Sequence, residues 1–226
     1  MPKMKSSRDS EWARKTVGGG SKKNMEDRIR VLDGFHTPKI AVDRLVEEVK
    51  LKRRVWECAN GHNRISGRLT KKHRRRVFRS DIHRWVPETQ KIIDFTDTTF
   101  RPFKGKPFDI VTNPPFVRGQ EFIETAMQLL PPGGKLCLLL RLQFLEGGKR
   151  RILFEKYPPS EVLVFSKRLP RMHRFDFSLK AFKRSVLKSG KKYTEPSSAL
   201  CFCWIVWEKK SSPLTQAAVE TKLRWI

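Results

Sequence analysis

The sequence predicts an α/β fold, a three-layer sandwich in which helices cover both faces of a mostly parallel sheet of about seven strands. Apolar runs of strand length alternate along the chain with segments of helical periodicity, which is the pattern of repeated strand-helix-strand units. Several of these runs are apolar throughout, as parallel strands covered on both faces must be. The length of 226 residues suits one domain with a core of its own.

The first predicted element is a helix over residues 38–50. Thr37 and Pro38 provide a cap and a first-turn proline, and apolar residues follow at helical spacing. A short strand over residues 55–57 comes next and ends in the glycine-containing turn 58–61, after which a polar stretch has a helical pattern. Strand, turn and helix in this order are typical of a nucleotide-binding unit.

The alternation continues through the rest of the chain. A helical pattern begins at Phe122 and ends at the prolines and glycines of residues 131–134. Further strands are predicted at the apolar runs 77–78, 92–93, 108–111, 136–140, 162–165 and 200–207.

The flanking segments differ from this core. Residues 1–30 are predicted to be a flexible basic arm, because they contain a Gly-Gly-Gly-Ser run and no apolar periodicity. Residues 31–210 form the predicted main domain, with a basic insertion at 167–195 before the last strand. Residues 211–226 are predicted to be a short polar C-terminal tail of no clear role.

The composition indicates a polyanionic partner. The chain has 49 Lys and Arg against 23 Asp and Glu, a net charge of +26, so nucleic acid is the first candidate. Four cysteines without Cys-x-x-Cys spacing, and histidines without paired ligand spacing, predict an intracellular, cytoplasmic protein with reduced thiols and no metal site. Neither a membrane span nor a secretion signal is recognisable, so neither a membrane location nor export is expected.

The strongest local signal is the run Asn113-Pro114-Pro115-Phe116, which follows the apolar strand 108–111 almost directly. Two adjacent prolines fix the backbone and donate no hydrogen bond, so nearby carbonyls and the Asn113 side-chain oxygen form a rigid group of acceptors. Phe116 offers a face on which an aromatic base could stack. The alternative is an ordinary strand-ending turn, with Asn113 as a cap and Phe116 in the core.

Such acceptors fit a planar ring that bears an exocyclic amine. Hydrogen bonds accepted from both amine protons draw the nitrogen towards a tetrahedral geometry, and its lone pair can then attack an electrophilic methyl group. This chemistry needs acceptors more than it needs a strong base.

At these residues the chain resembles the class I, S-adenosylmethionine-dependent methyltransferases that act on exocyclic amines, whose signature is Asn or Asp, two prolines and an aromatic residue. Among them it is most similar to the small phage-type adenine DNA methyltransferases. The resemblance implies a Rossmann-like fold and extends from residue 35 to about 208, with the motifs in the expected order. The matching runs are residues 35–38, 55–61, 80–82, 94–95, 144–147, 164–168 and 204–208.

The resemblance implies S-adenosylmethionine as the cofactor and no metal. Glu57 and Gly61 would hold its methionine part, with Thr37 and Pro38 closing over the same end. Asp81 would accept the ribose hydroxyls, and its place at the end of the next strand agrees with nucleotide-binding units, although it could instead cap a helix. The full set of implied cofactor residues is Phe35, Thr37, Pro38, Glu57, Ala59, Gly61, Asp81, Ile82, Asp94 and Phe95.

Asp94 would accept the adenine amine of the cofactor while Phe95 packs on its ring, and either could instead be an ordinary strand-end residue. The chain departs from the family at the glycine-rich turn, where Asn60 and Asn63 replace the usual Cys or Ala and Gly. Because Asn tolerates a positive φ better than most residues, the turn is expected to form. Phe116 replaces a frequent Tyr, and stacking needs only the ring.

Two basic segments are candidates for contacting nucleic acid. The first has seven potential cations within residues 68–76 and no acid, and like charges at this density usually face an anion. A solvated helix end or a nuclear-localisation signal are the alternatives. The second, residues 167–192, interleaves ten Lys or Arg with aromatic residues, and its alternative is a solvated loop. The predicted contact residues are Arg68, Lys71, Lys72, Arg74, Arg75, Arg76, Lys167, Arg168, Arg171 and Arg174.

The sequence and the resemblance together predict methyl transfer from S-adenosylmethionine to the exocyclic amine of adenine in DNA. The base would be flipped out of the duplex to lie beside Asn113 and Phe116. RNA adenine methylation is the first alternative, and a non-catalytic nucleic-acid-binding protein with a degenerate methyltransferase fold is the second. A third related activity, modification of glutamine in proteins, suits the charge of +26 poorly.

Overall fold

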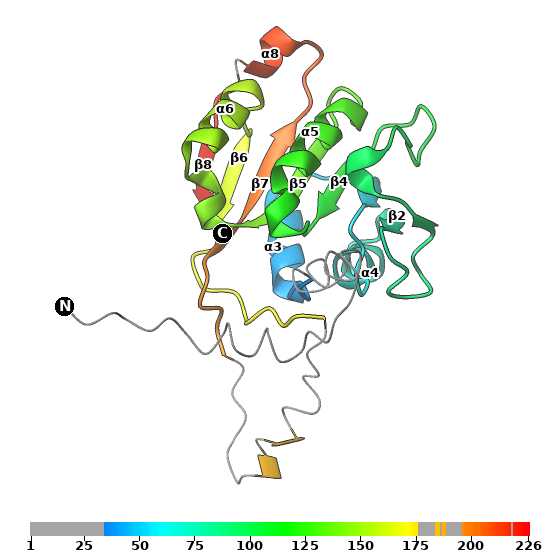
Figure 1. Ribbon diagram of the computed structural model, residues 1–226, viewed down its shortest axis with the longest axis vertical. Helices are drawn as coiled ribbons and strands as arrows, with labels where there is room; N and C mark the ends of the chain where they lie inside the picture. The colour runs from blue at the N-terminus through cyan, green and yellow to red at the C-terminus, as the bar shows by residue number, and fades with distance from the viewer. Residues whose placement is uncertain (1–33, 176–183, 186, 189–195, 218) are drawn as a thin grey trace, which may run out of the picture.

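The computed structural model describes residues 34–175, 184–185, 187–188, 196–217 and 219–226. Its eight strands form one sheet in the order β3-β2-β1-β4-β5-β7-β6-β8 (Figure 1). The predicted basic arm and most of the basic insertion lie outside the described residues. The strands are β1 (Arg54–Glu57), β2 (Arg76–Asp81), β3 (Lys91–Ile92), β4 (Asp109–Thr112), β5 (Lys135–Arg141), β6 (Glu161–Val164), β7 (Phe202–Glu208) and β8 (Lys222–Trp225).

The sheet is parallel except at one strand. β1 pairs in parallel with β2 and β4, and β4 pairs in parallel with β5. Only β7 among the described strands runs the other way, and it pairs with β5 on one side and β6 on the other. The predicted mostly parallel α/β sheet is therefore confirmed, with eight strands where about seven were expected.

The eighth strand comes from the C-terminal segment, to which the sequence assigned no role. Residues 213–217 form the short helix α8 (Pro213–Ala217), and β8 pairs in parallel with β6 at the edge of the sheet. Arg224 in β8 forms ion pairs with Glu161 of β6, at 2.7 Å, and with Glu48. Leu223 and Trp225 are 54% and 67% exposed, so this strand has little of the apolar burial by which the central strands were recognised.

Two pairs of helices cover the two faces of the sheet. One face carries α3 (Lys39–Glu48) and α4 (Arg64–Lys71), which pack on Val55, Val77 and Val111. The opposite face carries α5 (Gly119–Leu129) and α6 (Gly148–Lys156), which lie in front of the sheet in Figure 1. Short 3-10 turns follow three of the strands, at Phe95–Asp97, Phe116–Arg118 and Leu142–Leu145. No helix within the described residues is long and apolar enough to cross a membrane.

A buried carboxylate aligns the three central strands. Asp109, at the first position of β4, is fully buried and accepts hydrogen bonds from the backbone N–H of Lys52 before β1 and of Lys135 at the start of β5. The Lys52 ammonium lies 3.9 Å from the same carboxylate. Because all three strands are fixed at this end, their opposite, carboxyl ends are also held in register.

We expect Asp109→Ala to lower the free energy of unfolding by about 2–4 kcal/mol, because it removes a buried acceptor and leaves two part-buried N–H groups without their partner. Chemical denaturation of the full chain measures this. The matched control is Asp97→Ala, since Asp97 is exposed, and it should change the free energy by less than about 0.5 kcal/mol. Equal stability of the two variants would contradict the alignment role.

Candidate functional site

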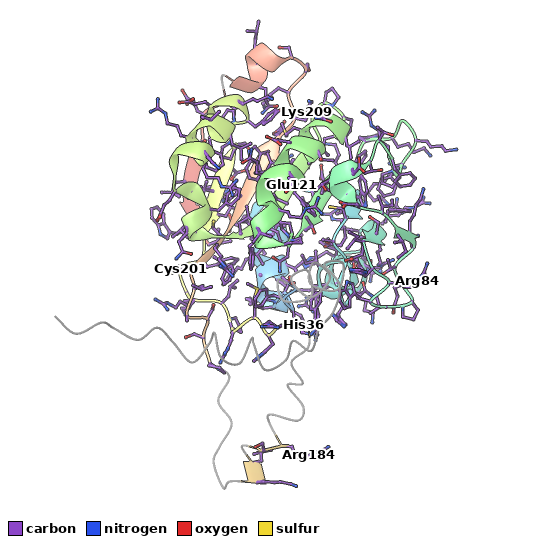
Figure 2. The ribbon with its side chains drawn as sticks, viewed as in Figure 1. His36, Arg84, Glu121, Arg184, Cys201 and Lys209 are labelled. Carbon is purple, nitrogen blue, oxygen red and sulfur yellow. The ribbon has the colours of Figure 1, made fainter. Side chains whose placement is uncertain are left out.

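The site lies at the carboxyl ends of β1, β2 and β4. Figure 2 shows His36 and Cys201 towards this end of the molecule and Lys209 at the other. A cavity of about 110 Å³ opens here, and it is bounded by every implied cofactor residue except Pro38. The structure therefore brings together residues that the sequence spreads over five separate segments. They are Phe35, Thr37, Glu57, Ala59, Gly61, Asp81, Ile82, Asp94 and Phe95, and Asn113 and Pro115 join them.

Glu57 ends β1 as a buried carboxylate that is only 1% exposed. Its Oε1 accepts a long hydrogen bond, 3.4 Å, from the N–H of Ala59. Its Oε2 has no hydrogen-bond partner among the described residues. Burial raises the pKa of Glu57 well above its usual range, and the nearby Thr112 hydroxyl counters this shift only in part. A buried carboxylate in this state is best satisfied by a cationic donor from outside the chain.

The turn after β1 forms despite its asparagines, as expected. Gly61 and Asn63 adopt positive φ angles of 48° and 58°. The Ser66 hydroxyl donates to the side-chain oxygens of Asn60 and Asn63, which fixes both at the start of α4. Asn63 therefore replaces the glycine of related turns without loss of the backbone conformation.

Asp81 holds this turn from the neighbouring strand. Its Oδ2 accepts the N–H of Gly61 at 2.8 Å, and its Oδ1 accepts the N–H of His83 at 3.0 Å and the indole N–H of Trp85 at 3.2 Å. Burial raises the pKa of Asp81, and these hydrogen bonds oppose that shift. A contact with ribose hydroxyls stays a prediction, and the structure adds a second role, in which the carboxylate fixes Gly61.

Asp94 and Phe95 lie at the start of the 3-10 turn that follows β3, and both border the smaller cavity. Asp94 accepts hydrogen bonds from the N–H and hydroxyl of Thr96 and pairs with Arg118 at 3.2 Å. Burial alone would raise the pKa of Asp94, but these hydrogen bonds and the Arg118 charge lower it. Phe95 is 2% exposed and packs edge-on against Trp56, at 5.1 Å between ring centroids. It serves the core and the cavity wall together.

Asn113 follows β4 and offers one unsatisfied acceptor. Its amide N–H donates to the Thr37 hydroxyl at 3.1 Å and to the Phe35 carbonyl at 3.5 Å. Its Oδ1 is buried and has no partner in the part of the chain that the structure describes. Pro114 is buried behind it. The side chain is thus held by its nitrogen while its oxygen is available to a ligand.

Phe116 faces a second, larger cavity of about 500 Å³. Its ring lies between Phe35 and Phe202, at centroid distances of 5.7 and 5.8 Å, and the Arg141 guanidinium covers it at 4.6 Å. Phe35 borders both cavities. The predicted catalytic motif therefore separates the two cavities, with Asn113 on one side and Phe116 on the other.

Some cations of the first basic segment, residues 68–76, pair with an acidic side chain, and others are exposed. Asp43 of α3, 6% exposed, accepts from Arg68 at 2.8 Å and lies 3.0 Å from the Lys72 ammonium and 2.8 Å from the His73 ring. These hydrogen bonds, first that from Arg68, hold the pKa of Asp43 well below its usual range. The segment contains no acid of its own, and the neutralising carboxylate comes from another helix. Lys71, Arg74 and Arg76 are exposed, and Arg75 is half-buried.

The described part of the second basic segment reaches the larger cavity. Arg171 and Arg174 border it beside Phe116. Arg168 donates to the carbonyls of Ser198 and Ala199, both at 3.3 Å, and Lys167 is exposed. No group of three or more His, Cys, Asp or Glu with metal-binding geometry occurs among the described residues.

Three aromatic side chains of the smaller cavity were not predicted as part of it. His62, Trp85 and Phe175 border it, and Phe175 comes from the basic insertion. Trp85 is four residues beyond Asp81 and could have been suspected from that spacing. Nothing in the local sequence of Phe175 places it beside a turn more than one hundred positions earlier.

Comparison with known proteins shows the fold. No protein-family model matches the sequence, and no curated protein does. Among solved structures, the methyltransferase subunit of a type I restriction-modification system from Streptococcus thermophilus is 13% identical and superposes with a TM-score of 0.51. The match covers 79% of this chain and 45% of that one, so the chain spans less than half of its length.

Two other solved structures have lower TM-scores. A TehB-like SAM-dependent methyltransferase from Corynebacterium glutamicum is 16% identical, with a TM-score of 0.45 over 75% of this chain and 88% of that one. A SAM-dependent O-methyltransferase from Thermotoga maritima is 13% identical, with a TM-score of 0.44 over 77% and 66%. The observed sheet and the superposition on the Streptococcus thermophilus subunit confirm the predicted Rossmann-like fold.

The cations around Asp43 generate a prediction about stability. Asp43→Asn should lower the free energy of unfolding at pH 7 by about 1–3 kcal/mol, because it removes the negative charge with which Arg68 and Lys72 pair. Since the pKa of Asp43 is lower in the folded state, its contribution is complete above the ordinary value of 3.8 and is lost as the pH falls through the folded value. Denaturation of both proteins between pH 7 and pH 3 should show the difference shrinking in acid. A difference that grows in acid would contradict this account.

Proposed function

We propose that the protein transfers a methyl group from S-adenosylmethionine to the exocyclic amine of adenine in DNA. The observation that carries the proposal is the buried Asn113 Oδ1, which has no partner among the described residues and lies in a turn fixed by two prolines. A buried acceptor with no donor in the described part of the chain is suited to a donor on a substrate.

The lining of the smaller cavity supports the cofactor assignment. Glu57 Oε2 is buried and has no partner among the described residues, and the ammonium of the methionine part would supply a cationic donor. The positive φ at Gly61 lets the backbone approach a ligand closely. When bound, S-adenosylmethionine supplies an electrophilic methyl group on a sulfonium.

Asn113 would act on the attacking nitrogen. Its Oδ1 accepts a hydrogen bond from the adenine amine, which favours a tetrahedral nitrogen with an available lone pair. Methyl transfer would form the new N–C bond while the C–S bond of the cofactor breaks with its electron pair left on sulfur, and the extra proton would leave the nitrogen to solvent. The donor contacts to Thr37 and Phe35 keep the amide from turning its nitrogen towards the substrate.

The larger cavity suits a nucleotide drawn out of a polymer. It has an aromatic floor at Phe116 and cationic sides at Arg171 and Arg174, so a base can stack while its phosphate meets a positive charge. An incoming base must displace the Arg141 guanidinium from the ring, at 4.6 Å. Duplex DNA buries its adenine amine, so base flipping is part of the proposal.

One further observation favours an active enzyme over a degenerate binding protein. A degenerate binding protein was an alternative because asparagines occupy the glycine-rich turn. In the structure Asn63 adopts a positive φ angle, so the turn still forms.

The catalytic part of the proposal predicts a selective loss of turnover. Asn113→Ala should lower kcat by at least about a hundredfold, the order expected for losing one preorganised polar group at the reacting centre. The affinity for S-adenosylhomocysteine, the demethylated product, should change less than about threefold, because the acceptor meets the substrate amine and not the cofactor. Methyl transfer and calorimetry on the same protein separate the two. Turnover equal to wild type would exclude amine activation by Asn113.

The nucleic-acid part of the proposal predicts that residues 74–76 of the first basic segment contribute more to DNA binding than Arg68 and Lys72 do. Replacing Arg74, Arg75 and Arg76 by Gln should flatten the dependence of log Kd on log salt by about two to three units on duplex DNA, if each meets a phosphate. The matched control replaces Arg68 and Lys72 by Gln, and it should flatten the slope by less than one unit, because a buried carboxylate of α3 already pairs with both. Equal slopes for the two variants would contradict the prediction that residues 74–76 contact phosphates while Arg68 and Lys72 do not.

A further inference from the structure

The segment 172–175 of the basic insertion is attached to the chain just before α3. The N–H of His36 donates to the carbonyl of His173 at 2.8 Å, and the N–H of Phe175 donates to the carbonyl of Gly34 at 3.0 Å. Phe35 and Arg174 form an isolated antiparallel bridge between these contacts. The segment therefore lies along residues that border the smaller cavity.

This attachment places the Phe175 ring over two glycines that are far apart in the sequence. A Cβ at Gly34 would lie 2.5 Å from Cδ2 of the ring, and a Cβ at Gly61 would lie 2.5 Å from its Cζ. Neither distance is tolerable for real atoms, so the ring can lie here only because both positions lack a side chain. Gly61 is the turn residue that the Asp81 carboxylate holds.

The ring also completes an aromatic wall. Its centroid lies 4.5 Å from that of His62, 5.1 Å from that of His36 and 5.3 Å from that of Trp85. Trp85 donates its indole N–H to Asp81, so the wall is joined to a second implied cofactor residue. Burial, together with the nearby Arg64, lowers the pKa of His36 to about 4, which keeps its ring neutral near pH 7.

We propose that Phe175 is a cofactor-binding residue supplied by the basic insertion, and that its ring forms the outer wall of the cofactor cavity above Gly61. The proposal rests on the proposed function. Phe175 is only half-buried and borders the cavity, so it has ring surface that a bound cofactor can cover.

The position of Phe175 also connects the two cavities. Arg171 and Arg174, on the same short segment, border the larger cavity. A polymer bound there would hold the segment against residues 34–36 and so keep the ring over the cofactor. Because such coupling is reciprocal, nucleic acid and cofactor should each strengthen the binding of the other.

Calorimetric titration of the full chain with S-adenosylhomocysteine tests whether the Phe175 ring contacts the cofactor. Phe175→Ala should weaken binding by about two- to tenfold, the range expected for losing one aromatic contact, and Phe175→Tyr should restore it. Met172→Ala is the matched control, since Met172 is buried in the same segment but does not border this cavity. Thermal melting shows that each variant is folded.

The outcomes separate this inference from the proposed function. Wild-type protein that binds no S-adenosylhomocysteine overturns both. If wild type binds and Phe175→Ala binds equally well, the ring makes no contact and only the inference fails. Tighter binding by Phe175→Ala would show that the ring obstructs the cavity. Equal weakening in Met172→Ala would show that the loss of affinity comes from a disturbed segment 172–175 and not from the ring. Either result overturns the inference.

The coupling has its own measurement. A saturating short DNA duplex should tighten the binding of S-adenosylhomocysteine to wild type by about fivefold or more. The same duplex should have a much smaller effect on Phe175→Ala, in which the ring that transmits the effect is missing. An equal effect on both proteins would overturn the coupling.

Discussion

The parallel pairing of β2, β1 and β4 is the constraint on which the site depends. Parallel strands end at the same edge of a sheet, so Glu57, Asp81 and Asn113 meet there although they are far apart in the sequence. Asp109 secures the other end of β4 by bonding to the chain before β1 and at the start of β5. A slip in this pairing would separate the carboxylate of Glu57 from the acceptor of Asn113.

The site combines local acceptors with a strongly basic chain. Two oxygens at the strand ends, Glu57 Oε2 and Asn113 Oδ1, are buried without partners among the described residues, and leaving such groups unsatisfied opposes folding by about 1–3 kcal/mol each. In the proposed function the cofactor ammonium would satisfy Glu57 Oε2, and the substrate amine would satisfy Asn113 Oδ1. The net charge of +26 has the sign that suits a polyanionic partner. In the proposed function, cofactor and amine recognition are thus separate from polymer recognition.

The features that sequence reasoning found are local, and those that it missed depend on distant contacts. Apolar runs mark the central strands because those strands are covered on both faces, and the Asn113 motif is visible because prolines act on their own neighbours. The edge strand β8 was not predicted because it buries little apolar surface. The ion pairs of Asp43 and the cavity contact of Phe175 were not predicted because they join residues that are far apart in the sequence and meet only in the folded chain.

The central claim is that the amine of adenine in DNA receives the methyl group. Its most direct test incubates the protein with S-adenosylmethionine labelled in the methyl group and with duplex DNA or structured RNA in parallel, followed by digestion to nucleosides and chromatography. The account predicts label in DNA, in deoxyadenosine methylated on its exocyclic nitrogen. Label in RNA alone would move the substrate to the other polymer, and no label in either nucleic acid would contradict the account.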